Sequence, residues 1–239
     1  IVIGAGAGGL VTSYIAAAVK AKVTLIEAGE MGGDCLNYGC VPSKAIIKSA
    51  KILSQFQQAE KYGLDNTKVG FSFKKVMQRV HDVIAEIAPH DSVERYTELG
   101  VEVIEGYASF VDPWTVEIAL NDGSKQRLSA RNIVIASGAR PFVPPLPGIE
   151  DSAYVSRDTM WAECAKLEEA AKKLVVLGGG PIGCELAQAF ARLGSEVSQI
   201  ELAKRLMTKE DEEVSEFVMQ SLQDSGVNVL TEHEALRFE

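Results

Sequence analysis

The sequence predicts an α/β fold with two parallel-sheet units, and three observations lead to this prediction. A β-rich run, a glycine-rich turn and a helix-forming stretch follow one another at the start of the chain and again from residue 174. Both turns match the pattern G-x-G-x-x-G, and a glutamate lies 23 residues after the first glycine of each. One such match is weak evidence, but a repeat of strand, turn, helix and acid at the same spacing favours two Rossmann-like dinucleotide-binding domains.

The first turn follows the apolar run 1–3, which we expect to be a strand. Gly4 allows the tight turn, and Gly6 lets backbone amides approach a pyrophosphate. Gly9 lets the helix pack closely on the strand, and Gly8 completes the turn. All four glycines are therefore candidate cofactor-binding residues.

An acid at the end of the second strand completes the first fingerprint. We expect a helix over residues 10–19 and a strand over residues 22–26. Glu27 follows this strand, where its carboxylate can accept hydrogen bonds from the hydroxyl pair of a ribose. Its position predicts a contact with a bound nucleotide.

The second fingerprint repeats this order at an offset of 174 residues. A strand is expected over 174–177, a helix over 184–193 and a second strand over 196–200. Glu201 takes the place of the ribose-contacting acid. The candidate nucleotide-binding residues of this turn are Gly178, Gly180, Pro181, Ile182 and Gly183.

Two cysteines, Cys35 and Cys40, follow the first fingerprint. A regular helix would separate residues five apart by about 7.5 Å along its axis, and a disulfide needs Cα atoms within about 7 Å. A bond between them therefore requires irregular backbone, which Gly39 and Pro42 can supply. Pro42 also suits the first turn of a helix expected to continue from Ser43 to near Gly63. Cys40 would then lie at a helix N-terminus, where the dipole favours a thiolate and lowers its pKa.

Redox use of this pair competes with two other interpretations. A purely structural disulfide closing so short a loop would stabilise the fold by only about 2 kcal/mol. A metal site would need more ligands, but Cys164 and Cys184 are scattered and the chain has three histidines. We therefore expect no metal site and favour a redox-active pair.

Composition excludes several classes of protein. The net charge of −9 and the pI near 5.0 argue against nucleic acid and against an anionic membrane surface. No apolar run approaches 18 residues, and no signal peptide is visible. Four cysteines, two of them a redox pair, suit a reducing cytoplasm. The chain starts within a strand without a methionine and ends soon after a strand-like run, so we expect it to be cut at both ends.

Between the two fingerprints the pattern predicts a long helix and a small antiparallel sheet. Apolar residues recur at helical spacing over residues 72–99, where Pro89 is expected to break or kink the helix. Short β-rich runs at 101–110, 115–120 and 127–128 indicate the antiparallel strands.

A proline-rich segment is expected to connect two domains. Residues 131–136 have the pattern of a buried strand, and four of the eight prolines follow between residues 141 and 147. We therefore expect a first domain over 1–148 and a second over 149–239, with a helix at 211–223 near its end.

Four motifs, in their order along the chain, resemble those of one enzyme family. They are the turn 4–9, the run Cys35-Leu36-Asn37-Tyr38-Gly39-Cys40-Val41-Pro42-Ser43-Lys44, the run Ala136-Ser137-Gly138-Ala139-Arg140-Pro141, and residues 178–185. Over its whole length the chain resembles the class I pyridine nucleotide-disulfide oxidoreductases, also called flavoprotein disulfide reductases. Within that family it looks most like the branch of mercuric reductase and dihydrolipoamide dehydrogenase.

The resemblance implies FAD at the first fingerprint, NAD(P)H at the second, and an enzyme that passes hydride between them. Cys35 would exchange with the substrate, and Cys40 would lie against the flavin ring. Lys44 would lie near the flavin, paired with Glu185 from the second domain. Electrons would pass from NAD(P)H through FAD to the Cys35–Cys40 disulfide, and then to a disulfide, a dithiol or a mercuric ion.

The resemblance also assigns further FAD contacts. Tyr107 and Ala108 would lie in a strand whose backbone meets the adenine, and Ser137 and Gly138 in the segment that closes over the FAD. The remaining candidates in these motifs are Gly33, Asp34 and Arg140.

Three positions depart from the pattern of the best-known members. Asp34 stands where threonine is usual, and an acid near a pyrophosphate must point away or find a donor. Ser137 replaces threonine but keeps the hydroxyl. Pro181 stands where some members have an aromatic gate.

The choice of nicotinamide cofactor depends on Glu201. Its carboxylate would repel a 2′-phosphate and accept the hydroxyls of NAD, so NAD is favoured. Lys204 and Arg205 soften this preference without reversing it, and NADP stays possible.

The family's C-terminal His-Glu pair and its dimer interface would lie beyond Glu239, so the full-length parent is expected to be a homodimer. His81 and Glu86 have a similar spacing but fall on the helix expected over 72–99, and His90 and His233 receive no role. Two alternatives stay open: a flavin-dependent NADH oxidase on the same scaffold, and a truncated, non-catalytic module that binds FAD or NAD.

Overall fold

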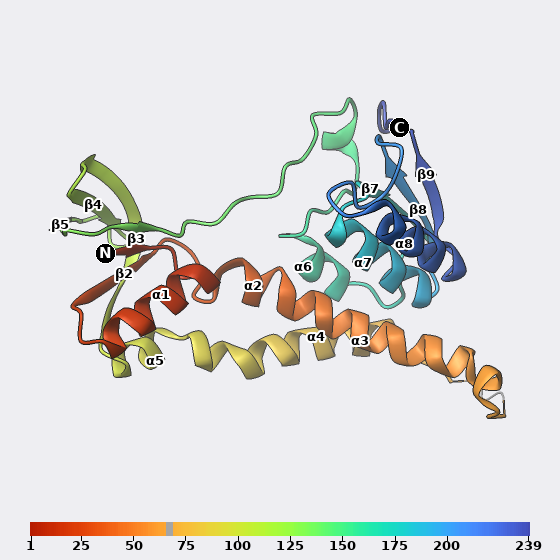
Figure 1. Cartoon of the computed structure of the whole chain (residues 1–239), viewed down its shortest axis with the longest axis horizontal. Helices are drawn as coiled ribbons and strands as arrows, with labels where there is room; N and C mark the ends of the chain where they lie inside the picture. The colour runs from red at the N-terminus through yellow and green to blue at the C-terminus, as the bar shows by residue number, and fades with distance from the viewer. Residues whose placement is uncertain (66–68) are drawn as a thin grey trace. The chain divides into compact units, whose positions relative to one another are not determined.

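The computed structural model describes residues 1–65 and 69–239 (Figure 1). It forms two compact units, each assembled from two stretches of chain. The first unit comprises residues 1–42 and 81–141, and the second comprises residues 43–80 and 142–239. Two helices, α3 (Cys40–Gln57) and α4 (Phe73–Ile87), each begin in one unit and end in the other. The linear boundary expected near residue 148 stays a prediction.

The first unit is built on a mixed sheet. Within the described residues its strands are β1 (Val2–Ile3), β2 (Val23–Glu27), β3 (Val101–Asp112), β4 (Thr115–Leu120), β5 (Lys125–Ser129) and β6 (Val134–Ile135), in the order β5-β4-β3-β2-β1-β6. Strand β3 pairs parallel with β2 as far as Glu105 and antiparallel with β4 from Gly106 onward. The antiparallel extension predicted from the short β-rich runs is therefore a continuation of the parallel sheet.

Two helices of the first unit, α1 (Ala7–Ala18) and α5 (Val93–Glu98), pack on the parallel part of this sheet. The short helix α2 (Gly33–Asn37) contacts α1, and the 3-10 turn η2 (Ala88–Asp91) precedes α5. Pro89 lies in η2 and ends the long helix α4, as its ring and missing N–H require. The predicted break at this proline is confirmed.

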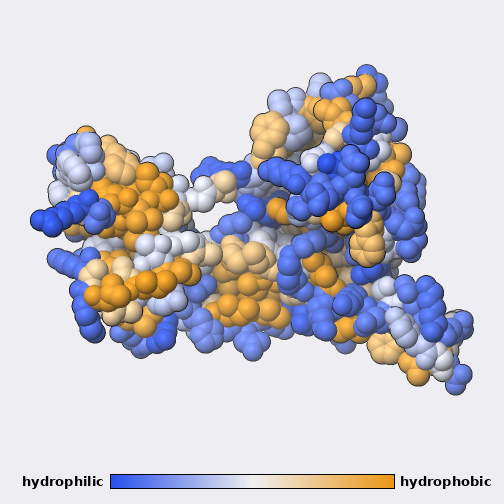
Figure 2. Space-filling view, in the orientation of Figure 1, coloured by the Kyte–Doolittle hydropathy of each residue, from blue (hydrophilic) through white to orange (hydrophobic). Residues whose placement is uncertain are grey.

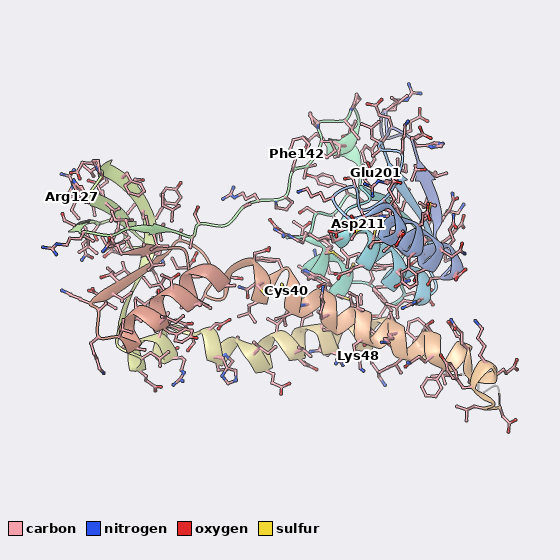
Figure 3. All side chains as sticks on the ribbon, in the orientation of Figure 1. Cys40, Lys48, Arg127, Phe142, Glu201 and Asp211 are labelled. Carbon is pink, nitrogen blue, oxygen red and sulfur yellow. The ribbon has the colours of Figure 1, made fainter. Side chains whose placement is uncertain are left out.

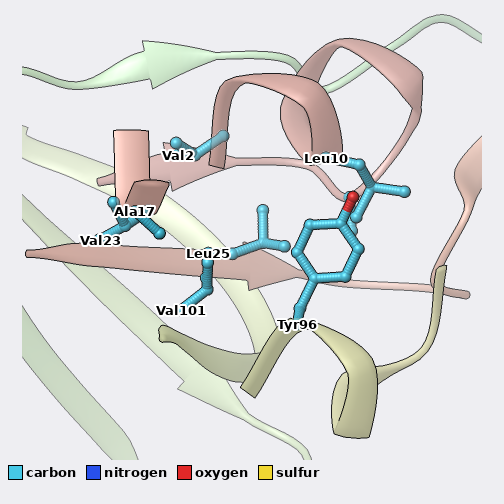
Figure 4. Close-up of a cluster of buried hydrophobic side chains, with 8 residues drawn as sticks. Val2, Leu10, Ala17, Val23, Leu25, Tyr96 and Val101 are labelled. Carbon is cyan, nitrogen blue, oxygen red and sulfur yellow. The ribbon is translucent and has the colours of Figure 1, made fainter. Parts of the chain in front are cut away.

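A cluster of buried apolar side chains joins α1 and α5 to strands β1, β2 and β3 (Figure 4). Its members are Val2, Ala5, Leu10, Ala17, Val23, Leu25, Tyr96 and Val101. Because these side chains fix both the end of β1 and the start of α1, the glycine turn between them is held on rigid elements.

The second unit contains a parallel sheet in the order β7-β8-β9. These strands are β7 (Lys173–Leu177), β8 (Glu196–Glu201) and β9 (Asn228–Thr231), and two helices, α7 (Pro181–Arg192) and α8 (Glu212–Asp224), lie beside them (Figure 1). Shorter helical segments are η1 (Ala59–Tyr62), η3 (Ile149–Asp151) and α6 (Met160–Ala165). This order of strand, turn, helix and strand is the predicted one.

The strand expected to be buried over 131–136 differs from the prediction. Only Val134 and Ile135 form the strand β6, and they are 38% and 67% exposed. The reason is position, since β6 is the last strand of its sheet and pairs only with β1. An apolar run alone does not distinguish a central strand from an edge strand.

Apolar side chains also reach the surface elsewhere in the described part of the chain (Figure 2). On α1 they are Val11, Tyr14 and Ile15, followed by Val19 at the C-cap of the helix. None of the helices in the described ranges combines the length and the apolar character needed to cross a bilayer.

Candidate nucleotide sites and cysteine pair

The first glycine turn leaves no room for side chains at two of its positions. Gly4 has φ +101°, and a Cβ there would lie 2.2 Å from the carbonyl oxygen of Ala136. A Cβ on Gly9 would lie 1.7 Å from the carbonyl oxygen of Gly4. The turn is tied to the sheet because the Gly4 N–H donates to the Ile26 carbonyl over 2.8 Å. Helix, turn and strand are therefore in direct backbone contact, as the fingerprint predicts.

The same turn is open where a ligand would approach it. Gly6 is the N-cap of α1, and a Cβ on Gly8 would meet nothing within 4 Å. The first amides of a helix have no intrahelical acceptor, so those of α1 remain available to an anion. Gly33 lies against this turn, because a Cβ on it would be 2.6 Å from the Gly6 Cα.

Glu27 closes the first turn onto the strand that precedes it. Its Oε2 accepts a hydrogen bond from the Ala5 N–H at 2.5 Å, and its Oε1 accepts one from the Gly29 N–H at 2.7 Å. Each carboxylate oxygen can accept a further bond. The structure thus gives Glu27 a role in shaping the turn, and its contact with a ribose stays a prediction.

The second glycine turn repeats this geometry. Gly178 has φ +106°, and its N–H donates to the Ile200 carbonyl over 2.8 Å. A Cβ on Gly183 would lie 2.3 Å from the Gly178 carbonyl oxygen. Glu201 (Figure 3) accepts from the Gly179 N–H at 2.6 Å and from the Ala203 N–H at 2.7 Å. The offset of 174 residues in the sequence is therefore a repeat in three dimensions.

Pro181 is the first residue of α7, where a missing N–H leaves no intrahelical bond unmade. Ile182 is half exposed beside it, and a Cβ on Gly180 would meet nothing within 4 Å. The second turn therefore offers an open N-terminus like that of the first, with one backbone donor fewer.

The backbone between the two cysteines is irregular at the predicted place. Cys35 lies in the short helix α2, and Cys40 is the first residue of α3 (Figure 3). The chain turns at Gly39, whose N–H donates to the Asp34 carbonyl over 2.6 Å. A Cβ on Gly39 would lie 3.0 Å from that oxygen, so a larger residue would push the two helices apart. Pro42 lies in the first turn of α3, as expected.

Both sulfurs are thiols in this structure, and they interact with each other. Partial burial, followed by a hydrogen bond with Cys40, raises the pKa of the Cys35 thiol to about 11. Cys40 is exposed and lies at the N-terminus of an 18-residue helix. Exposure favours Cys40 as the sulfur that solvent reaches. Which cysteine exchanges with the substrate and which lies against the flavin stays a prediction.

Lys44 and Glu185 form the ion pair that the resemblance implies. The Lys44 Nζ lies 2.8 Å from Oε1 and 2.6 Å from Oε2 of Glu185. Their side chains are 60% and 42% exposed, and such pairs contribute only about 0–1 kcal/mol to folding. Stability therefore does not account for this pair. The ion pair does hold the Lys44 ammonium group about one helical turn after Cys40 on α3.

The other FAD candidates surround the first unit's turn or its sheet. Tyr107 is 67% exposed on β3, and Ala108 next to it pairs with Ile118. Ser137 and Gly138 follow directly after the Ala136 carbonyl that contacts the first turn. Their contacts with FAD stay predictions.

Two polar candidates of the first unit are exposed to solvent, Asp34 and Arg140. Asp34 lies in the first turn of α2, where a carboxylate suits the helix dipole. This placement supplies a physical reason for an acid at a position where threonine is usual.

The comparison with known proteins now decides the family. The model of the family described as pyridine nucleotide-disulphide oxidoreductase matches residues 1–239. The chain belongs to this family. The predicted fold class is confirmed as well, because the chain superposes on LpdA from Mycobacterium tuberculosis with a TM-score of 0.85 at 23% identity, covering 99% of this chain and 52% of that one.

Relatives within the family include enzymes of two kinds. A mercuric reductase from Bacillus cereus is 32% identical over 97% of this chain and 35% of its own length. A dihydrolipoyl dehydrogenase from Zymomonas mobilis is 35% identical over 97% of this chain and 49% of its own length. The Cu(II) complex of the HOCl-induced flavoprotein disulfide reductase RclA from Escherichia coli is 27% identical with a TM-score of 0.79, covering 99% of this chain and 49% of that one. The chain thus spans about half of these proteins or less.

Arg205, which we expected to soften the preference for NAD, has hydrogen-bond partners in the loop after β8. Its Nη1 donates to the Glu210 carbonyl and the Ser215 Oγ, each over 2.7 Å. Its Nη2 donates to the Thr208 carbonyl over 3.3 Å. Arg205 therefore holds the loop after β8 together. Its expected influence on the choice between NAD and NADP stays a prediction.

Sequence reasoning gave no role to Gln199. Gln199 is fully buried on β8, and its Nε2 donates to the carbonyl of Gly178 over 2.9 Å. Gln199 lies two residues after the buried Val197, on the same face of β8, and this position was the available signal, since buried polar groups require partners.

Proposed function

We propose that this chain forms the nucleotide-binding and cysteine-bearing part of a FAD-dependent oxidoreductase. It would take electrons from NAD(P)H and deliver them to the Cys35–Cys40 pair, and from there to a substrate. One observation carries the proposal: the helix with Cys35 packs directly on the first nucleotide turn. Gly32 donates its N–H to the Ala5 carbonyl over 3.0 Å, and Gly33 contacts Gly6.

The residues of the first turn fit a flavin dinucleotide. Gly6 and Gly8 carry no side chain at the mouth of the turn, and α1 presents its first amides there. FAD, when bound, supplies acceptance of a hydride from nicotinamide and transfer of two electrons to a disulfide. The same features at Gly178, Gly180 and the start of α7 suit the pyrophosphate of NAD(P).

The two cysteines supply the next step. Two electrons and two protons break the Cys35–Cys40 bond and leave two thiols. Burial raises the pKa of Cys35 and keeps its proton in place at neutral pH. Loss of a proton from the exchanging thiol lets it attack a substrate disulfide or bind a soft metal ion.

The names of the relatives support two substrate classes. The matching proteins include mercuric reductases and dihydrolipoyl dehydrogenases, so a mercuric ion or a disulfide/dithiol is the proposed partner. A homodimeric parent belongs to the same proposal, as the family resemblance implies. A cytoplasmic location belongs to it as well, because four cysteines with one redox pair suit a reducing compartment.

A reductive titration tests the proposal. The FAD-loaded protein that contains this chain is titrated with NADH without oxygen, while free thiols are counted with a chromogenic disulfide. Electron storage in both flavin and cysteines predicts uptake of about two NADH per FAD and the appearance of two thiols. Uptake of one NADH with no new thiols would leave a flavin oxidase as the better description. A protein that retains no flavin would instead be a nucleotide-binding module.

The second turn favours NAD over NADP. Glu201 places a carboxylate at the end of β8, and Arg205 is engaged by Glu210, Thr208 and Ser215. The other basic residue near Glu201 is Lys204, which is exposed on the same loop. One lysine against one glutamate does not offset the repulsion of a phosphate dianion.

Glu201→Gln is therefore expected to narrow the preference for NADH over NADPH by roughly fivefold or more, because it removes the charge and keeps the side-chain size. The measurement is kcat/KM with each cofactor. Glu27→Gln is the matched control, since Glu27 makes the same pair of backbone contacts in the first turn. An equal change in both variants would show that the effect comes from turn geometry and not from charge.

A further inference from the structure

We propose that Gln199 and Cys184 are positioning residues that fix the second glycine turn in its nucleotide-binding conformation. The inference rests on the proposed binding of NAD(P) at that turn. It concerns two buried polar side chains that the fingerprint itself does not include.

The two side chains lie beneath the turn and hold two successive carbonyls. Gln199 is fully buried, and its Nε2 donates to the Gly178 carbonyl over 2.9 Å and lies 3.5 Å from the Cys184 sulfur. Cys184 is 6% exposed, and its Sγ donates to the Gly179 carbonyl over 3.5 Å. Each of the first two peptides of the turn therefore has a side-chain donor on its buried side.

The first unit offers an internal comparison. At the offset of 174 residues, Cys184 corresponds to Leu10 and Gln199 to Leu25. Both leucines are buried in the apolar cluster of the first unit, 4% and 0% exposed (Figure 4). The first turn is thus formed over an apolar base, and the polar pair is particular to the second turn.

Folding stability does not explain why the second unit has glutamine and cysteine where the first unit has two leucines. A leucine at position 199 would bury apolar surface, whereas Gln199 leaves its Oε1 without a hydrogen-bond partner among the described residues. A buried unpartnered amide oxygen costs folding free energy. We therefore expect Gln199 and Cys184 to fix the conformation of the second glycine turn.

Because a trans peptide is planar, a side chain that holds its carbonyl oxygen also fixes the direction of its N–H. No cis bond occurs in the described chain, so each N–H points opposite to the carbonyl of its own peptide. The peptide whose carbonyl Gln199 holds directs the Gly179 N–H to Glu201, at 2.6 Å. The Gly179 carbonyl accepts from the Cys184 Sγ and also from the Met207 N–H over 2.8 Å, so the Gly180 N–H of the same peptide points the opposite way. A Cβ on Gly180 would meet nothing within 4 Å, so the turn is open at this residue, where we expect a pyrophosphate to bind.

The test compares Gln199→Met with Leu25→Met in the FAD-loaded protein. Methionine has nearly the size of either residue and no amide donor, so the first variant removes the bonds and the second controls for buried methionine in a matching strand. For Gln199→Met we expect the Kd for NADH to rise roughly three- to tenfold, with KM raised, kcat at saturation retained and FAD content unchanged. For Leu25→Met we expect the Kd for NADH to stay as in the parent.

A folded Gln199→Met protein with the parent's Kd for NADH would overturn the inference and leave the proposed function intact. A parent protein that binds neither NADH nor NADPH would overturn both. Should Gln199→Met not fold, Cys184→Ala decides, because it removes the side-chain donor to the Gly179 carbonyl and leaves only the Met207 N–H on that oxygen, at 2.8 Å. A raised Kd for NADH in Cys184→Ala supports the inference, and an unchanged one contradicts it.

Discussion

Replacing Gly9 with alanine is expected to disrupt the first nucleotide turn and to abolish FAD retention. The new Cβ would lie 1.7 Å from the Gly4 carbonyl oxygen and 2.9 Å from its carbon. Gly4 cannot withdraw easily, because its N–H is bonded to Ile26 and its other side contacts Ala136. We expect a loss of about 3 kcal/mol or more in the free energy of unfolding, at the upper end of overpacking effects. Urea denaturation and the flavin-to-protein ratio measure the two consequences.

Gly8→Ala is the control, one residue earlier on the same helix. Its Cβ would meet nothing within 4 Å, and alanine is a better helix former than glycine. We expect this variant to match the parent or to gain up to about 1 kcal/mol in stability. Equal stability of the Gly8 and Gly9 variants would show that the close approach in the turn is not what holds the fold.

Local features of the sequence predicted the two turns well. The conformations at Gly4 and Gly178 follow from short-range sterics, and the spacing to Glu27 and Glu201 follows from the lengths of one helix and one strand. Pro89 ended its helix for an equally local reason. Such elements are decided by a few consecutive residues, and a single sequence contains that information.

Features that depend on distant residues were predicted less well. The exposure of Ile135 depends on its strand having one neighbour, and the partners of Arg205 depend on how the loop after β8 folds back. Lys44 and Glu185 are 141 residues apart, and only the resemblance to a family paired them. The contact of Gln199 with the second turn had no counterpart in that resemblance, which is why the structure was needed to find it.

Cys35→Ser and Cys40→Ser are each expected to lower the turnover of a disulfide substrate by at least about 100-fold, because one sulfur cannot store an electron pair as a disulfide. The two variants should differ in spectrum. If Cys40 is the thiolate beside the flavin, the long-wavelength absorbance of the half-reduced protein is lost in Cys40→Ser and kept in Cys35→Ser. Cys164→Ser is the control, because Cys164 is a buried thiol on α6 outside the pair, and we expect it to keep turnover.

The pH dependence of alkylation gives a second readout for the reduced pair. Burial and the hydrogen bond with Cys40 raise the pKa of Cys35 to about 11, so the reactive thiolate of Cys35 is scarce at neutral pH. Its alkylation rate should rise about tenfold per pH unit and not level off before about pH 11. In Cys40→Ala the hydrogen-bonding partner is gone, and the levelling should move to lower pH. A Cys35 rate that levels off near neutral pH in the parent would contradict the protonated state assigned to it, and would make Cys35 the resting thiolate.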